Sequence, residues 1–260
     1  MSGPLFLEER RQAILDVLER DGRVTVNGLS DAMGVSQVTI RQDLRALEDQ
    51  GFLERTYGGA VYKGAGTSLK ELSFNMRLTK MHREKDAIAK LAVLLIQENH
   101  SIALDSSTSA YALVPYLKRF NKLTLVTNGL MLAQSFLDDD ENRVRVLMTG
   151  GRLRRDSISL VGQPGSLPDI NLNIGFFSSR GLAWGIGASE IDQDEVIIKQ
   201  AMLTRCVKTV LLIDGSKWGQ VAPYTILPDE RIDHIITTPG APDDLVERYR
   251  ALGTQVDVAR

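Results

Sequence analysis

Three long polar side chains near the start of the sequence, Gln37, Arg41 and Arg45, are spaced four residues apart. On a helix this spacing places them in one stripe along the surface. Arginine pairs with guanine through two hydrogen bonds, and the glutamine amide pairs in the same way with adenine. Thr39, whose methyl group can contact that of thymine, and Gln42 lie nearby. The stripe predicts a helix that reads base edges in the major groove of duplex DNA.

Ser36, Arg55 and Tyr57 extend this interpretation to the phosphate backbone. Ser36 precedes the predicted helix, where a hydroxyl and a backbone N–H can face a phosphate with support from the helix dipole. Arg55 and Tyr57 lie in residues 52–63, whose two short extended runs around a glycine pair predict a small β-hairpin that reaches the adjacent backbone.

The same helix also carries Asp43, Glu48 and Asp49, and mixed charges of this kind usually belong to a helix that is simply solvated. The chain has 31 Lys and Arg against 33 Asp and Glu, a formal net charge of −2. Overall charge therefore does not indicate a nucleic-acid partner, and contact with DNA requires basic side chains gathered on one surface.

Small hydroxylated residues follow the ends of several predicted strands in the second part of the chain. In an α/β sheet, such turns place backbone N–H groups and a helix N-terminus against an anion such as phosphate. The residues of this kind are Asp105, Ser106, Ser107, Thr108 and Ser109 in one turn, Thr127 and Asn128 in a second, and Gly150 and Gly151 with Arg152 in a third. Serine and threonine clusters also cap helices for structural reasons alone, so both interpretations stay open.

Glu195, Lys199 and Lys217 are charged candidates at the same edge of the predicted sheet. Glu195 and Lys199 are four residues apart on a predicted helix, and Lys217 follows the apolar run TVLLID. Ligands of open α/β sheets bind at the carboxyl ends of strands, which favours a binding role. The alternatives are an ordinary ion pair on a helix surface and a solvated lysine.

Three short helices are expected to carry the first group of residues. Apolar residues recur at helical spacing from residue 8 to 34 and again from 37 to about 51. Gly22 and Gly34 are expected to end the first two helices in the left-handed conformation, and Ser36 is a suitable N-cap for the third. A helix, a tight turn and a second helix with a polar outward face form a helix-turn-helix.

From residue 84 onward, amphipathic helical segments alternate with short apolar runs. The seven predicted strands cover residues 101–105, 123–128, 144–150, 174–179, 209–214, 232–238 and 255–259. Strands buried on both faces and joined by helices form a mainly parallel sheet, an α/β fold. We therefore expect a DNA-binding domain over 1–63, a linker over 64–83, and an α/β domain over 84–260 for effector sensing and oligomerisation.

The segment from Val24 to Val61 resembles the N-terminal signature of the DeoR family of bacterial transcriptional regulators. It combines a Val-Ser-x-x-Thr-Ile-Arg-x-Asp-Leu helix with Leu-Glu-x-x-Gly and a Gly-Gly-Ala hairpin, in the expected order. Gln42 stands where the family commonly has a second arginine or another polar residue, which should alter operator preference. The resemblance implies a winged helix-turn-helix that binds double-stranded operator DNA.

The later motifs are also similar to the DeoR family, whose C-terminal sensor resembles ribose-5-phosphate isomerase and typically recognises a phosphorylated sugar. By that resemblance, the phosphate is held by Ser107, Thr108 and Ser109, and the candidates for the sugar end are Asn128, Arg152, Glu195 and Lys217. Ser107 and Ser109 replace a glycine and a threonine of the family loop, and Arg180 is a further departure, so the ligand can differ. Within the family, the chain is most similar to regulators of amino-sugar (N-acetylgalactosamine) use.

The resulting hypothesis is a repressor of a carbohydrate-use operon that is released from DNA when a phosphosugar binds. A compact winged helix buries limited surface on DNA, so a homo-oligomer, either a dimer or a tetramer, is expected to read repeated half-sites. The first alternative is a phosphosugar isomerase-like enzyme, with Asp105 or Glu195 as the proton-transfer base. The second is a DNA-binding protein that responds to no effector.

Several other classes of function are disfavoured by composition. The single cysteine, Cys206, and three scattered histidines show no metal-ligand spacing, so neither a metal site nor a redox cofactor is expected. No apolar run approaches the roughly 18 residues of a membrane span, and the start lacks the apolar core of a signal peptide, so we expect a cytoplasmic protein without a membrane partner.

Overall fold

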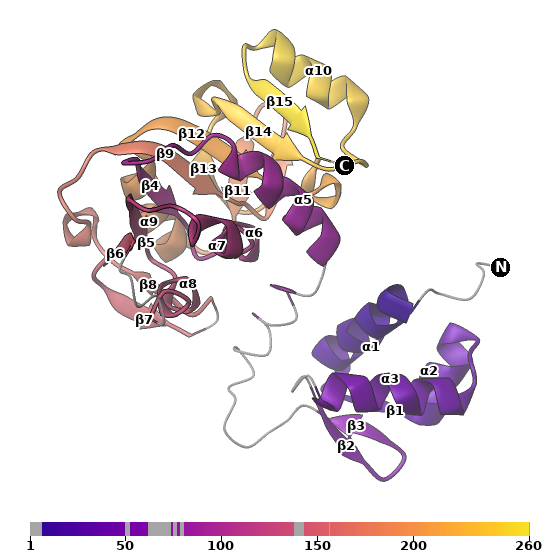
Figure 1. Cartoon of the computed structure of the whole chain (residues 1–260). Helices are drawn as coiled ribbons and strands as arrows, with labels where there is room; N and C mark the ends of the chain where they lie inside the picture. The colour runs from indigo at the N-terminus through magenta and orange to yellow at the C-terminus, as the bar shows by residue number, and fades with distance from the viewer. Residues whose placement is uncertain are drawn as a thin grey trace. The chain divides into compact units, whose positions relative to one another are not determined.

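The structure of the chain is a computed structural model that describes residues 7–49, 53–61, 74, 77–78, 81–137, 143–155 and 157–259, apart from the side chains of residues 8, 9, 12, 16, 19 and 20. The chain divides into two compact units, Met1–Lys80 and Met81–Arg260 (Figure 1). Most of the predicted linker, residues 64–83, lies outside the described residues.

The first unit is a winged helix-turn-helix. Its elements are α1 (Leu7–Asp21), β1 (Arg23–Thr25), α2 (Val26–Met33), α3 (Gln37–Asp49), β2 (Glu54–Thr56) and β3 (Gly59–Val61). The three strands form an antiparallel sheet in the order β1-β3-β2, with the β2-β3 hairpin as the wing. The three helices and the hairpin are confirmed. Strand β1 was not predicted, because three residues are too few to show an alternating pattern.

Local sequence signals explain the turn between α2 and α3. Gly34 ends α2 at φ 64°, in the left-handed region that glycine adopts most easily. The Oγ of Ser36 accepts a hydrogen bond of 3.1 Å from the backbone N–H of Thr39, so Ser36 is the N-cap of α3 as predicted. A buried apolar core that includes Ile40, Leu44 and Leu47 fixes which side of α3 faces inward.

The second unit is built on a seven-stranded sheet in the order β15-β14-β12-β9-β4-β5-β6, with every neighbouring pair parallel. The strands are β4 (Ser101–Leu104), β5 (Leu123–Thr127), β6 (Val144–Met148), β9 (Leu172–Phe177), β12 (Cys206–Leu212), β14 (His234–Thr237) and β15 (Gln255–Val258). Each of the seven predicted strands overlaps one of them, so the α/β prediction is confirmed.

Each face of this sheet carries its own apolar core, which explains the continuous apolar runs in the strands. On one face, residues such as Leu104 and Phe176 pack with α5 (His82–Val93), α7 (Val114–Leu117) and α8 (Leu130–Gln134). On the other, residues such as Phe177 and Leu211 pack with α9 (Gln193–Leu203) and α10 (Asp243–Ala251). Both layers of helices are visible in Figure 1. The remaining α-helix of this unit is α6 (Thr108–Tyr111).

Two smaller sheets and three 3-10 turns complete the described part of the second unit. They are the antiparallel sheet β10 (Gly181–Ala183), β11 (Gly187–Glu190) and β13 (Tyr224–Leu227), the hairpin β7 (Arg152–Arg154) and β8 (Ser159–Val161), and the turns η1 (Pro164–Ser166), η2 (Gly215–Lys217) and η3 (Asp229–Arg231). The short strands were not predicted. Cys206 opens strand β12, because α9 already ends at Leu203.

Within the described ranges, no helix is long and apolar enough to cross a membrane.

Candidate functional site

The solvent-facing side of α3 carries the predicted DNA-reading residues. Its inward side buries Ile40, Leu44 and Leu47 completely or nearly so. The outward side exposes Gln37, Arg41, Gln42 and Arg45. Arg41 donates a hydrogen bond of 3.2 Å to the side-chain oxygen of Gln37, so these two side chains already lie alongside one another. The helix therefore presents a polar and basic surface of the kind that hydrogen-bonds to base edges.

Two of the three acidic residues of α3, Asp43 and Glu48, are paired with arginines. Asp43 is buried, and its two carboxylate oxygens lie 2.6 Å from Arg10 Nε and 3.1 Å from Arg11 Nε, both on α1. Glu48 lies 2.7 Å from Nε of Arg55 in the wing. Asp49 is exposed. The negative charges that favoured simple solvation are therefore largely neutralised by arginines from other elements.

The residues proposed to contact the DNA backbone occupy different environments. Ser36 is exposed, but its hydroxyl caps α3 and lies 2.8 Å from the hydroxyl oxygen of Thr39, which is half-buried. Arg55 is exposed and paired with Glu48. Tyr57 is fully exposed at the tip of the wing. Of these residues, Tyr57 is the one whose side chain projects freely into solvent.

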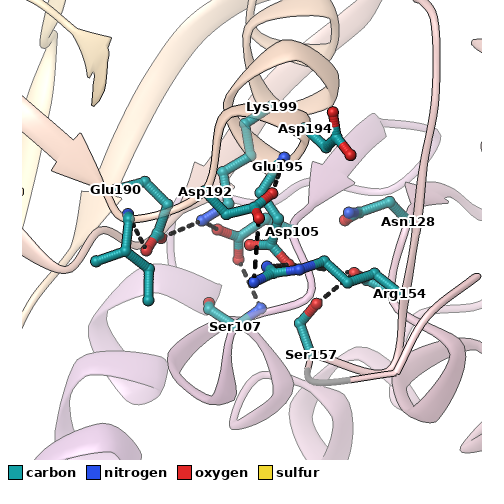
Figure 2. Close-up of polar contacts among 12 residues, drawn as sticks. Asp105, Ser107, Asn128, Arg154, Ser157, Glu190, Asp192, Asp194, Glu195 and Lys199 are labelled. Carbon is teal, nitrogen blue, oxygen red and sulfur yellow. Dashed lines mark hydrogen bonds and ion pairs between the residues drawn. The ribbon is translucent and has the colours of Figure 1, made fainter. Parts of the chain in front are cut away.

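A buried group of charges lies at the carboxyl ends of strands β4 and β9 in the second unit (Figure 2). The ammonium of Lys199 on α9 lies 3.1 Å from Asp105 Oδ2 and 3.1 Å from Glu190 Oε2, and it donates a 3.0 Å hydrogen bond to the carbonyl of Ser178. Asp105 also accepts backbone hydrogen bonds from Ser107 and Ser178. These contacts saturate the three N–H groups of Lys199.

A second set of charges joins the β7-β8 hairpin to the start of α9. Arg154 Nη1 lies 2.9 Å from Glu195 Oε1, and Nη2 lies 3.4 Å from Asp192, the N-cap of the helix. Ser159 donates a 3.2 Å hydrogen bond to the same oxygen of Glu195. Arg152 forms its ion pair with Asp194 at the surface. Figure 2 shows Arg154 extending toward Asp192 and Glu195.

Burial and neighbouring charges shift the pKa values of these groups in different directions. Burial opposes ionisation of Lys199, but Asp105, Glu190 and Glu195 outweigh it and raise the pKa of the lysine. Burial likewise opposes ionisation of Glu195, yet Lys199, Ser157 and Arg154 together lower the pKa of its carboxyl. For Lys217 burial prevails, and its pKa is lowered despite the nearby Asp214.

Several predicted effector residues are committed to holding the fold. Ser107 caps α6 by accepting a hydrogen bond from Ala110, and Thr127 Oγ1 accepts one from the N–H of Gly129. A side chain at Gly151 would lie 2.4 Å from the carbonyl oxygen of Val161, so the glycine pair allows close approach of the chain to itself. Ser106, Thr108 and Ser109 are buried in the same turn.

Other predicted residues keep unused hydrogen-bonding groups. Asn128 is fully buried and donates to the carbonyl of Leu160, but its Oδ1 has no partner among the described residues. The same holds for the hydroxyls of Thr149 and Ser179, which follow strands β6 and β9. Lys217 is half-buried. Within the described part of the chain, its Nζ donates a hydrogen bond of 2.8 Å to Ser178 Oγ.

Sequence reasoning missed Glu190 and Ser178, and it did not include Arg154 among the effector residues. Ser178 had a detectable signal, because a pair of serines ends the predicted strand IGFFSS just as hydroxylated residues follow SIALD. Glu190 had none, since its role depends on a contact with Lys199 from another element. Among the described residues, no group of three His, Cys, Asp or Glu side chains is arranged to hold a metal ion.

A winged helix-turn-helix with a basic, outward-facing recognition helix, together with an α/β unit that gathers polar groups at its strand ends, defines a DNA-binding transcriptional regulator with a sensor domain. Comparison with protein families supports this class over both units. The DeoR-like helix-turn-helix domain matches residues 10–64, and the DeoR C terminal sensor domain matches residues 80–238. The chain belongs to the DeoR family of transcriptional regulators.

Curated relatives match over nearly the full chain. The HTH-type transcriptional regulator GolR of Listeria innocua is 34% identical over 257 residues, which cover 98% of this chain and 100% of the relative. The putative aga operon transcriptional repressor of Escherichia coli O157:H7 is 34% identical, covering 95% and 92%. The HTH-type transcriptional repressor GlcR of Bacillus subtilis is 29% identical, covering 90% and 89%.

Among solved structures, ribose 5-phosphate isomerase A from Methanocaldococcus jannaschii matches 53% of this chain and 55% of its own, with 13% identity and a TM-score of 0.39. A translation initiation factor eIF-2B from Pyrococcus horikoshii matches 84% and 74%, with 12% identity and a TM-score of 0.43. Likeness at this level carries no inference about ligand or chemistry.

Proposed function

We propose that the sensor unit binds a small phosphorylated sugar and that this binding releases a repressor of a carbohydrate-use operon from its operator. The observation that carries the proposal is the buried charged cluster around Asp105 and Lys199 at the carboxyl ends of parallel strands. This edge is where open α/β sheets bind ligands. Buried ion pairs are seldom retained for stability, because apolar side chains of similar volume stabilise a core as well or better.

Unused polar groups at the same strand ends support a ligand role. Asn128, Thr149 and Ser179 follow β5, β6 and β9, and each buries a side-chain oxygen that has no partner among the described residues. A buried polar group without a hydrogen bond costs about 1 to 3 kcal/mol. Because these three oxygens are buried, ligand binding must expose them before the hydroxyl groups of a sugar supply the missing partners.

The two lysines have different roles in this proposal. Lys199 has no N–H group left for a ligand, because Asp105, Glu190 and Ser178 occupy all three. It positions Asp105. Lys217 uses one N–H group on Ser178 and is half-buried, so two remain for an anion. We therefore assign the effector phosphate to Lys217 and to the buried hydroxyls of Ser106, Thr108 and Ser109, and we keep Arg152, which pairs with Asp194, as a further candidate.

The names of two relatives, the putative aga operon transcriptional repressor and the repressor GlcR, support repression as the sign of regulation. The winged unit supports oligomerisation, because a single compact module buries limited surface on DNA. A symmetric dimer or tetramer would place two recognition helices on successive major grooves. A second copy of the chain is thus a proposed partner, beside duplex DNA and the effector.

A thermal-unfolding screen tests the sensing proposal. The purified chain is heated with hexose, pentose and amino-sugar phosphates, each beside its unphosphorylated parent and inorganic phosphate. A phosphorylated sugar at 100 times its dissociation constant stabilises the chain by about 2.7 kcal/mol, and it reduces retention of promoter DNA in a gel-shift assay. Lys217→Met removes the shift, while Lys122→Met, at an exposed lysine, leaves it intact.

Other outcomes of the screen count against the proposal. If no phosphorylated sugar stabilises the chain or changes its retention of DNA, the effector is not of this class. If the chain converts one sugar phosphate into another, the isomerase alternative is correct, with Asp105 or Glu195 as the proton-transfer base. Equal stabilisation by a sugar phosphate and by its unphosphorylated parent would mean that the chain does not recognise the phosphate group.

A further inference from the structure

Val38 is the apolar residue on the outward side of the recognition helix. Its side chain is 62% exposed. A stripe along α3 contains Val38, Gln42 and Arg45, which follow i, i+4, i+7 spacing. This stripe lies opposite the buried Ile40 and Leu47, so Val38 occupies the centre of the surface that faces solvent.

Folding of the helix gives no reason for valine at this position. A β-branched residue has lower helix propensity than alanine, because its side chain loses rotamer freedom against the preceding turn. Exposure at 62% means that little apolar area is removed from water in return. Isolated exposed apolar residues are common on protein surfaces, so the position of this one decides its interpretation.

That position is the second residue of the recognition helix, within the N-terminal turn that contacts base edges in helix-turn-helix proteins. The exposed neighbours Gln37, Arg41 and Gln42 offer hydrogen bonds. In the major groove, the one apolar group that base pairs present is the C5 methyl of thymine. Val38 supplies the matching apolar contact within an otherwise polar surface.

The sequence pointed to Thr39 for this contact, and the structure makes Thr39 the weaker candidate. Thr39 is half-buried, on the flank of the helix rather than at its centre. Its hydroxyl oxygen lies 2.8 Å from the hydroxyl of Ser36, and its backbone N–H donates to the same oxygen. The residue is therefore part of the N-cap.

We propose that Val38 is a specificity-determining residue, whose side chain contacts the methyl group of a thymine in the major groove of the operator. The proposal rests on the chain reading DNA by sequence. Val38 adds an apolar contact to the hydrogen bonds that Gln37, Arg41 and Arg45 offer to base edges.

The test combines a truncated side chain with a truncated base. Duplexes enriched from a randomised library by the full wild-type chain serve as probes. Each thymine is replaced in turn by deoxyuridine, which lacks only the methyl group. Affinities are measured for the wild type, for Val38→Ala, and for Val207→Ala, which truncates a valine that is 83% exposed in the sensor unit.

At one thymine of each half-site, deoxyuridine is expected to weaken wild-type binding about four-fold, the value for one buried methyl-sized group. Val38→Ala weakens binding to the thymine duplex by at least as much, and it no longer distinguishes deoxyuridine from thymine there. Val207→Ala behaves as the wild type. The unfolding temperature of Val38→Ala is equal to that of the wild type or slightly higher, because alanine is the better helix former.

Two results overturn the proposal. One is a wild-type chain that tolerates deoxyuridine at every thymine. The other is a Val38→Ala variant that loses the same factor on thymine and deoxyuridine duplexes. If the wild-type chain enriches no duplex from the library, the winged unit does not read DNA by sequence. That result contradicts the proposed function itself, and the Val38 proposal falls with it.

Discussion

Two lysines in one cluster show how the surroundings of a side chain decide its role. Lys199 and Lys217 both approach Ser178, one at its carbonyl and one at its hydroxyl. Two carboxylates beside Lys199 raise its pKa above the ordinary value, whereas burial lowers the pKa of Lys217. The first lysine is a fixed cation within the fold, and the second has the environment of a ligand-binding group.

Removal of each lysine should therefore have different effects. Lys199→Met leaves Asp105 and Glu190 as buried charges without their shared partner, which costs about 3 to 5 kcal/mol. Lys217→Met should change the free energy of unfolding by less than about 1 kcal/mol. Urea unfolding followed by tryptophan fluorescence measures both, because the two tryptophans, Trp184 and Trp218, belong to the sensor unit. Equal losses for the two variants would contradict the assignment.

The buried His234 makes the stability of the sensor unit depend on pH. Its Nε2 lies 2.8 Å from Asp257, while its buried Nδ1 has no partner among the described residues. Burial lowers the pKa of His234 below its ordinary 6.5, and Asp257 only partly compensates. Because the unfolded chain binds this proton more readily, stability should fall as pH drops below about 6.5, by at most about 1.4 kcal/mol per pH unit.

The same urea experiment at pH 7.5 and 5.5 checks this dependence. His234→Gln retains an N–H donor for Asp257 but does not titrate, so it should lose less stability than the wild type between the two values. His82→Gln, at an exposed histidine, should keep the wild-type loss. A wild-type chain whose stability is the same at both pH values would refute the prediction.

At the scale of elements, α3 depends on ion pairs that cross to α1. The carboxylate of Asp43 pairs with both Arg10 and Arg11. Asp43 is a buried residue of α3, and the other buried residues of this helix are apolar. Two arginines on one carboxylate fix the rotation of α3 about its axis as well as its distance from α1. The direction in which Val38 and Arg45 point therefore depends on this contact.

Asp43→Asn should lower the free energy of opening the recognition helix by roughly 3 kcal/mol, because it removes the buried negative charge that Arg10 and Arg11 both contact. Hydrogen exchange of the backbone amides of α3 measures this loss, which should be accompanied by weaker binding to operator DNA. Asp49→Asn, at an exposed acidic residue on the same helix, is the matched control for the hydrogen-exchange measurement. Unchanged exchange in Asp43→Asn would mean that the apolar core alone orients α3.

Elements with one dominant pattern were predictable from sequence, while contacts between distant elements were not. The seven main strands were found because burial on both faces produces apolar runs such as TVLLID. Strands β7, β10 and β11 read RLR, GLA and GASE, so none of them contains such an apolar run. The pairing of Lys199 with Glu190 depends on how α9 packs near β11, and no local pattern encodes that contact.

At the scale of the whole molecule, linkage connects the two proposed binding events. If the effector prefers the DNA-free arrangement and weakens operator affinity by some factor, the operator must weaken effector affinity by the same factor. A coupling of about 1 to 3 kcal/mol corresponds to a change of about 5-fold to 150-fold in each affinity. The two factors are separately measurable, and a factor above one, found in both measurements, is what the mechanism requires.

Lys217→Met separates effector binding from DNA binding in the full chain. Because Lys217 lies in the sensor unit, the variant should bind an effector-free operator as tightly as the wild type, yet remain bound when the effector found in the thermal screen is added. Calorimetric titration of effector into free and operator-bound wild-type protein gives one coupling factor, and operator titration with and without effector gives the other. If both wild-type factors equal one, the effector binds without releasing the operator and the proposed regulation is wrong. If the variant already binds DNA more weakly without effector, Lys217 supports the fold and is not the anion contact.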